Sequence, residues 1–255
     1  MSSKLLLTLA LAIGPLWPPS CLSSRAAPAL AHDSASAPAS RNARSAEAVA
    51  GPVRIEVLAP GAHPQTFVMR GRTGPGRLVF LHGMCGHGLG YAQSFQFSAA
   101  KHGTLIAPQA DIVCGAGPWA KWSGKLEELD QRIQSAFRAL GHRDPIDDIV
   151  IMGYSQGATR AEELARRWPE RYTRLVLMGG PKAPSARGLS GVRAAVTMAG
   201  ERDRRDLMKA GAQALQAAGI PATFMLIPQA THGAMGPTPE QTMGEALDWL
   251  FQHSR

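Results

Sequence analysis

The residue in this sequence best placed to act as a nucleophile is a serine between two glycines, in the string Gly153-Tyr154-Ser155-Gln156-Gly157. The string follows an apolar run and precedes a helical pattern. In that setting G-x-S-x-G is typical of a strand-to-helix turn so sharp that glycine is needed on both sides of the serine. The turn presents the Ser155 hydroxyl at a helix N-terminus, whose free N–H groups favour negative charge. The alternative is an ordinary glycine-rich turn.

A serine hydroxyl is a weak nucleophile and needs a base that accepts its proton. His232 follows the last apolar run of the chain, residues 224–227, and lies C-terminal to Ser155. The chain order serine, acid, histidine is one in which such sites occur. His102 and His142 adjoin helices at the other side of the predicted sheet. The sequence therefore predicts His232 as the base.

A carboxylate must orient the histidine and stabilise its cation. Asp203 follows the apolar run 195–199, which precedes the run leading to His232, and it is the predicted partner. Asp206, three residues later, is the alternative. A third interpretation is that both aspartates cap the helix starting near Arg204, which is a common use of this residue type.

Attack on a carbonyl also requires donors for the negative charge that develops on its oxygen. The glycine-rich segment 81–88 ends the apolar run 78–81 and leaves backbone N–H groups free to face a ligand. The predicted donors are the N–H groups of Met84 and of Gln156, the residue after the serine. A phosphate-binding loop is the other use of such glycines, but the Gly-Lys-Ser/Thr sequence that it needs does not follow.

Short apolar runs alternate with helical patterns along the chain, and these elements must position the groups above. Strands are predicted at 53–57, 66–69, 78–81, 104–107, 149–152, 175–178, 195–198 and 224–227. Helices are predicted at 123–140, 156–168, 205–218 and 240–252. Buried strands that alternate with helices indicate an α/β fold with a mainly parallel sheet. Ligands bind beyond the carboxyl ends of such strands, which is where the candidate residues lie.

The composition bounds the class of protein. The 255 residues carry a formal charge of +8 and are 45% hydrophobic, which excludes a disordered or collagen-like chain. Arg residues are scattered rather than gathered in a basic stripe, so a nucleic-acid partner is not predicted. His82 and His87 flank Cys85 without a further ligand cluster, so no metal site is predicted.

The N-terminal segment has the features of a secretory signal peptide. Lys4 precedes the apolar run 5–13, and Ala29-Leu30-Ala31 offers small residues for cleavage after Ala31. An N-terminal membrane anchor is the alternative. Residues 32–51, rich in Ala and Ser, are predicted to be a linker, and residues 52–255 the folded domain. No stretch of about 18 apolar residues follows the signal peptide, so the mature chain is not expected to insert stably in a membrane.

Four motifs, in their order and at their strand ends, resemble those of the α/β-hydrolase family over nearly all of residues 52–255. They are Leu81-His82-Gly83, Gly153-Tyr154-Ser155-Gln156-Gly157, Gly200-x-x-Asp203 and His232-Gly233. The Ser-Gln-Gly elbow and Ala107-Pro108-Gln109-Ala110 are similar to the phospholipase/carboxylesterase or dienelactone-hydrolase-like branch. The resemblance implies an eight-stranded, mainly parallel sheet with helices on both faces. Residues 180–191 are too few for a helical lid, so no large lid is expected.

The resemblance also implies the chemistry. It points to hydrolysis of small-molecule carboxylic esters, or of thioesters, without a cofactor. An acyltransferase and a non-catalytic, hydrolase-fold binding protein of the cell envelope are the two alternatives. Tyr91, Trp119 and Trp122, together with Phe95, are candidates to line an acyl or aryl pocket, with ordinary core or rim packing as the other interpretation.

In the fold that the chain resembles, the strands at 78–81 and 104–107 are neighbours, so Cys85 and Cys114 lie at adjacent carboxyl ends. An exported protein meets an oxidising compartment. We therefore predict a Cys85–Cys114 disulfide that braces the oxyanion loop. The alternative role of Cys85 as a nucleophile is not favoured, because it sits on no elbow.

Overall fold

The computed structural model describes residues 53–58, 64–72 and 76–254. The chain divides into two units, Met1–Glu47 and Ala48–Arg255, and every described residue belongs to the second. The predicted signal peptide, residues 1–31, and the predicted linker, residues 32–51, lie outside the described residues.

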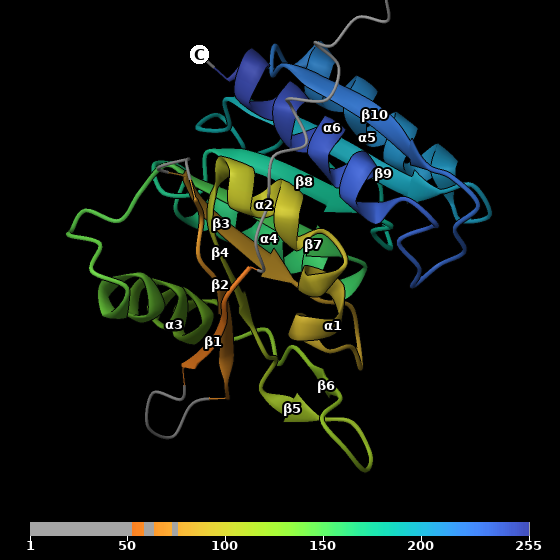
Figure 1. The fold of residues 1–255 in the computed structure, drawn as a ribbon. Helices are drawn as coiled ribbons and strands as arrows, with labels where there is room; N and C mark the ends of the chain where they lie inside the picture. Colours follow the sequence, from red (N-terminus) through yellow and green to blue (C-terminus); the bar gives the residue numbers. More distant parts are fainter. Residues whose placement is uncertain (1–52, 59–63, 73–75, 255) are drawn as a thin grey trace, which may run out of the picture. The chain divides into compact units, whose positions relative to one another are not determined.

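Eight strands form one sheet in the order β1-β2-β4-β3-β7-β8-β9-β10. Their bounds are β1 (Ile55–Leu58), β2 (Thr66–Met69), β3 (Gly76–Leu81), β4 (Gly103–Pro108), β7 (Ile149–Tyr154), β8 (Arg174–Met178), β9 (Ala194–Gly200) and β10 (Ala222–Ile227). Strand β2 pairs antiparallel with β1 and β4, and the other neighbours pair in parallel. The predicted mainly parallel, eight-stranded sheet is confirmed (Figure 1).

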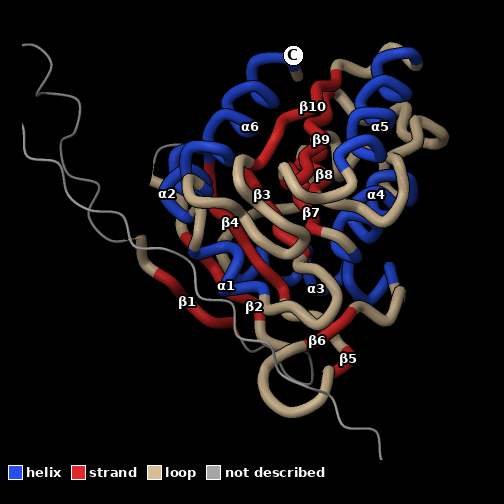
Figure 2. The backbone as a smooth tube through the Cα atoms, turned by 90° about the vertical axis from the view of Figure 1, so that its right-hand side faces the viewer, coloured by secondary structure: helices blue, strands red, loops and turns tan. Residues whose placement is uncertain are grey.

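Side chains of the central strands alternate between two hydrophobic cores, one on each face of the sheet. In β3, Val79 and Leu81 belong to one core, and Leu78 and Phe80 belong to the other. The first core is covered by α3 (Leu126–Ala139), α4 (Gln156–Arg167) and α5 (Arg205–Ala217), and the second by α1 (Gly88–Gln93), α2 (Gln96–His102) and α6 (Pro239–His253). Figure 2 shows α2 and α6 on one side of the strands and α4 and α5 on the other. The helices therefore cover both faces, as expected.

Helix α3 illustrates what holds these helices in place. Leu129, Ile133 and Phe137 recur every fourth residue and are buried in the first core. Burying such a side chain contributes about 1.5–3 kcal/mol. The N-cap residue of α3, Lys125, makes no side-chain capping bond. Packing of the apolar stripe, rather than capping, thus stabilises the helix.

The sequence patterns do not predict α1, α2 or the small hairpin of β5 (Ile112–Val113) and β6 (Ala120–Lys121). Helices of six or seven residues make too few turns for an apolar period to show, and two-residue strands show no alternation. Tertiary contacts hold these elements instead. Phe95 is fully buried in the second core, and Gly86 forms a β-bridge with Ala120.

The parallel strands end at one edge of the sheet, and the candidate residues follow those ends. Gly83 comes just after β3 and Ser155 directly after β7, while Asp203 follows β9 and His232 follows β10. The connection from β8 to β9, residues 179–193, contains neither helix nor strand. The sheet therefore gathers these four residues, and no helical lid arises from this connection.

Candidate active site

The turn that carries Ser155 is as tight as the sequence predicts. Ser155 has φ +52° and ψ −113°, directly between β7 and α4. A Cβ at Gly153 would lie 2.2 Å from the Gly157 carbonyl oxygen, and a Cβ at Gly157 would lie 2.0 Å from the Leu81 carbonyl oxygen. Both contacts are far below van der Waals distance. Steric exclusion by the backbone thus requires glycine on each side of the serine.

We expect Gly157→Ala to destabilise the fold by about 3 kcal/mol, because the added methyl group meets backbone atoms that cannot rotate away. Gly90→Ala is the matched control. Gly90 lies in α1 with open space at its Cβ position, so this change should be neutral or stabilise by up to about 1 kcal/mol. Urea unfolding of the two variants measures both free energies. Equal unfolding midpoints would contradict the tight elbow.

Three side chains from three strand ends form a continuous line of hydrogen bonds. His232 Nε2 lies 3.0 Å from Ser155 Oγ, and His232 Nδ1 lies 2.8 Å from Asp203 Oδ2. A carboxylate only accepts, so Nδ1 carries the proton, and the free lone pair of Nε2 accepts the Ser155 hydroxyl. The Asp203 side chain is 7% exposed, whereas that of His232 is 52% exposed. The buried carboxylate therefore fixes the tautomer of a histidine whose own side chain is half exposed.

The other carboxylate considered from the sequence lies elsewhere. Asp206 is exposed in the first turn of α5. The second carboxylate oxygen of Asp203, Oδ1, accepts the Arg204 N–H at 2.7 Å. Asp203 therefore binds His232 with one oxygen and the backbone of Arg204, the N-cap residue of α5, with the other. Helix α5 has no side-chain capping bond, so the capping interpretation does not apply to Asp203.

Two tyrosines hold the peptide that follows His232. The Tyr154 hydroxyl accepts the Gly233 N–H at 2.8 Å, and the Tyr91 hydroxyl donates to the Gly233 carbonyl at 2.9 Å. The two rings stack with centroids 5.5 Å apart. Burial raises the pKa of Tyr154 to about 12, so this hydroxyl stays protonated. Sequence reasoning missed the role of Tyr154, for which its position next to Ser155 is the only signal.

The loop after β3 passes directly beside Ser155. A Cβ at Gly83 would lie 3.4 Å from the Ser155 Cβ, and Met84 follows with an exposed side chain. His82 anchors the loop: its Nδ1 donates to the Gly83 carbonyl at 2.8 Å, and its Nε2 accepts the Ala110 N–H at 3.0 Å. Nδ1 therefore carries the proton, Nε2 does not, and the ring is neutral. Burial lowers the pKa of His82 to about 4.

The buried neutral His82 should make the fold sensitive to acid. Its pKa falls from 6.5 to about 4 on folding, so between these pH values the unfolded chain binds a proton that the folded chain does not. The contribution of His82 to the free energy of unfolding is complete above pH 6.5 and decreases by about 3 kcal/mol as the pH falls to 4. Urea unfolding at several pH values should therefore give a shallower pH dependence for His82→Gln than for the unaltered chain. Parallel curves would exclude this role.

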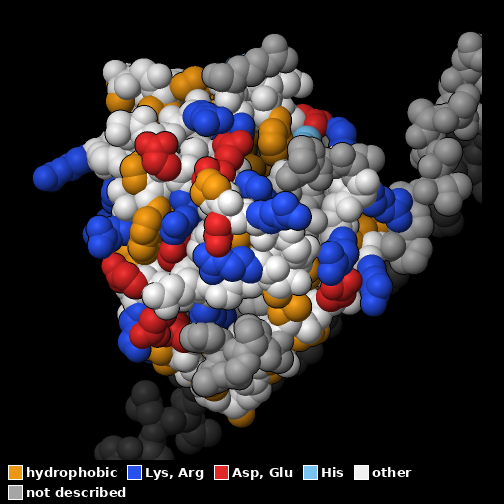
Figure 3. Space-filling model, turned by 90° about the vertical axis from the view of Figure 1, so that its left-hand side faces the viewer, with side chains coloured by type: hydrophobic (Ala, Val, Ile, Leu, Met, Phe, Trp, Pro, Cys, Tyr) orange, Lys and Arg blue, Asp and Glu red, His pale blue; other side chains and the backbone are white. Residues whose placement is uncertain are grey.

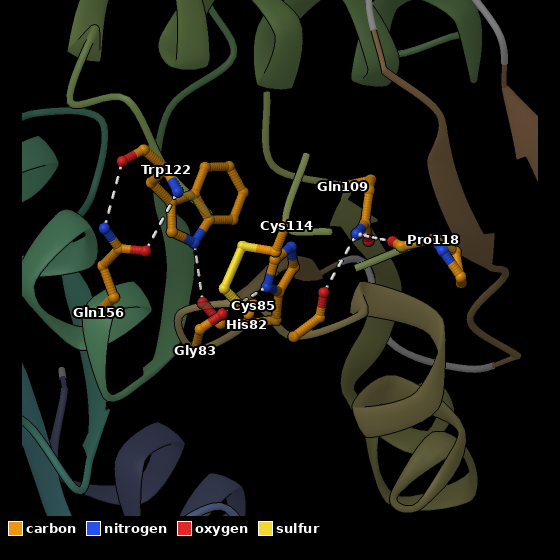
Figure 4. Close-up of a disulfide and its surroundings, with 9 residues drawn as sticks. His82, Gly83, Cys85, Gln109, Cys114, Pro118, Trp122 and Gln156 are labelled. Carbon is orange, nitrogen blue, oxygen red and sulfur yellow. Dashed lines mark hydrogen bonds between the residues drawn. A yellow bond between two sulfur atoms is a disulfide. The ribbon is translucent and has the colours of Figure 1, made fainter. Parts of the chain in front are cut away.

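The β5–β6 hairpin braces the same loop. Cys85 forms a disulfide with Cys114, with 5.5 Å between the Cα atoms, so the predicted disulfide is present. The buried Gln109 amide donates from Nε2 to the carbonyls of Gly86 at 3.2 Å and Pro118 at 2.8 Å (Figure 4). One covalent bond and one side-chain amide thus tie the loop to the hairpin.

Gln156, the residue after the serine, holds the segment that follows β6. Its side-chain amide accepts the Trp122 N–H at 3.1 Å and donates to the Trp122 carbonyl at 3.2 Å. Trp122 Nε1 in turn donates to the His82 carbonyl at 2.8 Å (Figure 4). Trp122 is only 4% exposed. Trp122 therefore connects the start of α4 to the loop after β3.

Three of the four aromatic side chains considered for a substrate pocket line cavities, in two pairs that share Trp119. Tyr91 and Trp119 line a cavity of about 480 Å³ that also includes Gly233, the residue after His232. Trp122 is not part of this cavity but lines a separate one of about 610 Å³ together with Trp119, and Phe95 is fully buried in the core. Core packing thus accounts for Phe95, while Trp119 keeps half of its surface exposed.

Two further findings concern only the described residues. Among them, no group of three or more His, Cys, Asp or Glu side chains is placed to hold a metal ion. None of the helices in this described part has the length and apolar character that crossing a membrane requires.

Comparison with known proteins identifies the architecture. No family model matches the sequence, and no curated protein matches it. Similar solved structures include FphF, a fluorophosphonate-binding serine hydrolase of Staphylococcus aureus, at 14% identity and a TM-score of 0.58, covering 78% of this chain and 99% of that one. S-formylglutathione hydrolase FrmB of the same organism gives the same identity, TM-score and coverage.

A third similar structure is naproxen esterase from Bacillus subtilis, at 14% identity and a TM-score of 0.53, covering 78% of this chain and 92% of that one. Identities at this level establish a shared architecture. The strand order, the helices on both faces and these likenesses agree with one another. The chain therefore has the α/β-hydrolase fold.

Proposed function

We propose that this chain is an exported serine hydrolase that cleaves carboxylic esters, with thioesters as a further substrate class. The observation that carries the proposal is the unbroken line of hydrogen bonds from Asp203 through His232 to Ser155. Nucleophile, base and orienting carboxylate are thus in contact at the strand ends where this fold binds ligands. The serine hydrolase, the esterase and the S-formylglutathione hydrolase that share the fold support the same reaction class.

The first half-reaction forms an acyl-enzyme. Ser155 Oγ bonds to the ester carbonyl carbon while His232 Nε2 takes the hydroxyl proton, and Asp203 stabilises the imidazolium. His232 then gives that proton to the alcohol oxygen as the carbon–oxygen bond of the ester breaks. The alcohol leaves, and the acyl group remains on Ser155.

The second half-reaction releases the acid. Water gives a proton to His232 and attacks the acyl carbon, and the bond to Ser155 Oγ breaks as His232 returns the proton to it. In both halves the N–H groups of Met84 and Gln156 would bind the oxyanion, each lowering the barrier by on the order of 3 kcal/mol. The reaction needs no cofactor, because nucleophile, base and donors all belong to the chain.

Two observations support the proposed location and partners. The Cys85–Cys114 disulfide fits an oxidising compartment outside the cytosol, which agrees with the predicted signal peptide. On the face that Figure 3 shows, Lys and Arg side chains are mixed with Asp and Glu side chains instead of gathering in one basic patch. A small-molecule ester, rather than a nucleic acid, is therefore the proposed partner.

Pre-steady-state hydrolysis of p-nitrophenyl esters of increasing acyl length tests the proposal. We expect a burst of p-nitrophenol equal to the active enzyme, because acylation releases the phenol before water releases the acid. Ester formation with an added alcohol in preference to the acid would instead identify an acyltransferase. Absence of turnover with every ester would favour the non-catalytic binding protein.

A further inference from the structure

An apolar groove lies beside the proposed catalytic histidine. Its volume is about 480 Å³, and its walls come from α1 with its two cap residues, the β5–β6 hairpin and the segment after His232. The side chains and backbone that matter here belong to His87, Tyr91, Ser94, Trp119, Gly233 and Met235. Trp119 is 49% exposed although it is large and apolar. An exposed indole at the mouth of such a groove is a surface available for binding.

The two hydroxyl groups of the groove are already engaged in hydrogen bonds within the protein. The Tyr91 hydroxyl donates to the Gly233 carbonyl, and the Ser94 hydroxyl donates to the Tyr91 carbonyl at 2.6 Å. No Asp, Glu, Lys or Arg lines the groove, and burial lowers the pKa of His87, so its ring is neutral at pH 7. A charged group entering this groove would lose its hydration without gaining an oppositely charged partner. The groove thus selects uncharged, apolar groups.

The position of the groove relative to the reaction decides which part of an ester it can hold. Gly233 and Met235 follow His232 directly in the chain, so one wall is continuous with the residue that delivers the proton to the leaving oxygen. Tyr91, in the opposite wall, stacks on Tyr154, which precedes Ser155. The leaving oxygen must lie on the His232 side of the acyl carbon to receive this proton.

We propose that this groove binds the alcohol portion of the substrate, and that this portion is uncharged and aromatic or similarly flat. The inference rests on the proposed esterase function and adds the substrate class. Trp119 and Tyr91 offer ring faces, and the His87 ring meets Trp119 edge-on with centroids 6.2 Å apart. Aromatic rings prefer such stacked and edge-to-face arrangements.

Kinetic measurements can distinguish a groove that binds the alcohol from a pocket that binds the acyl group. The alcohol is present during acylation and has left before deacylation. Changes to the groove should therefore alter acylation by aryl esters and leave hydrolysis of the acyl-enzyme unchanged. An acyl pocket would affect both steps, because the acyl group remains on Ser155 throughout.

Two ester series, measured with Trp119→Ala, test the proposal. The first keeps the acetyl group and varies the alcohol from ethanol through phenol to 1-naphthol. The second keeps p-nitrophenol and varies the acyl group from acetyl to octanoyl. Val113→Ala is the control, since Val113 is exposed on the same hairpin and does not line the groove. Trp119→Phe, which keeps a flat ring, guards against an effect of lost packing alone.

With Trp119→Ala we expect kcat/KM for 1-naphthyl acetate to fall about tenfold more than for ethyl acetate. In the acyl series, kcat/KM should fall by the same factor at every acyl length, and the rate of deacylation should be unchanged. Trp119→Phe should restore most of the lost kcat/KM, and Val113→Ala should match the unaltered chain. A loss that grows with acyl length, or slower deacylation, would overturn the alcohol assignment while the esterase function stands. Failure of the unaltered chain to hydrolyse any ester of either series would overturn both.

Discussion

Replacing Ser155 by alanine should lower ester turnover by on the order of 10³–10⁶-fold and leave the fold intact. The hydroxyl is the atom that bonds to the substrate carbon, and nothing else in the line of hydrogen bonds can take its place. The residual rate would come from binding and oxyanion donors alone. Steady-state hydrolysis of an aryl ester measures the loss, and thermal unfolding confirms that the variant is folded.

Thr159→Ala is a suitable control for Ser155→Ala, because it removes a hydroxyl from the same end of α4. Turnover by this control should stay within a few-fold of the unaltered chain, as is usual for a group outside the reaction. If Ser155→Ala retained more than a tenth of the original turnover, the chemistry would have to lie on another side chain.

Asp203→Asn should lower kcat by about 10⁴-fold. The amide can present its NH₂ group to His232 Nδ1 and so favour the tautomer whose proton sits on Nε2, facing Ser155. That tautomer cannot accept the serine proton. The structure supports this assignment through the 2.8 Å contact between His232 Nδ1 and Asp203 Oδ2. Measuring kcat with a saturating aryl ester isolates the effect from substrate binding.

Asp206→Asn provides the matched comparison, since it makes the same chemical change three residues away on an exposed position. We expect its kcat to be within twofold to threefold of the unaltered chain, in keeping with a surface substitution. Equal losses in the two variants would mean that the carboxylate has been assigned wrongly.

The strands could be predicted because parallel strands covered on both faces are continuous apolar runs, as Ile149–Tyr154 illustrates. The same logic puts Ser155, Asp203 and His232 at one edge of the sheet. The sequence predicts Asp203 but leaves Asp206 as an alternative, because both lie between the end of β9 and the first turn of α5. The choice depends on which carboxylate is buried toward the histidine, and that is a tertiary property.

Other features depend on contacts between distant segments and leave no local pattern. Gln109 acts through carbonyl groups on two loops, and Tyr154 acts on a peptide 79 residues away. The sequence around Trp122 has no apolar periodicity that would show whether its indole is buried or exposed. In the structure Trp122 is buried, whereas Trp119, three residues earlier, is half exposed. Whether each of these aromatic side chains is buried depends on whether the loop after β3 and helix α4 pack against it.

Labelling with a fluorophosphonate tests whether Ser155 is an activated nucleophile, because this reagent bonds only to a serine whose proton is withdrawn by a neighbouring base. We expect one adduct per chain, mapped by mass spectrometry to the peptide containing Ser155. We also expect no adduct in Ser155→Ala and strongly slowed labelling in His232→Gln. Full-length protein that stays unlabelled, or an adduct on a different serine, would contradict the claim that Ser155 is activated by His232.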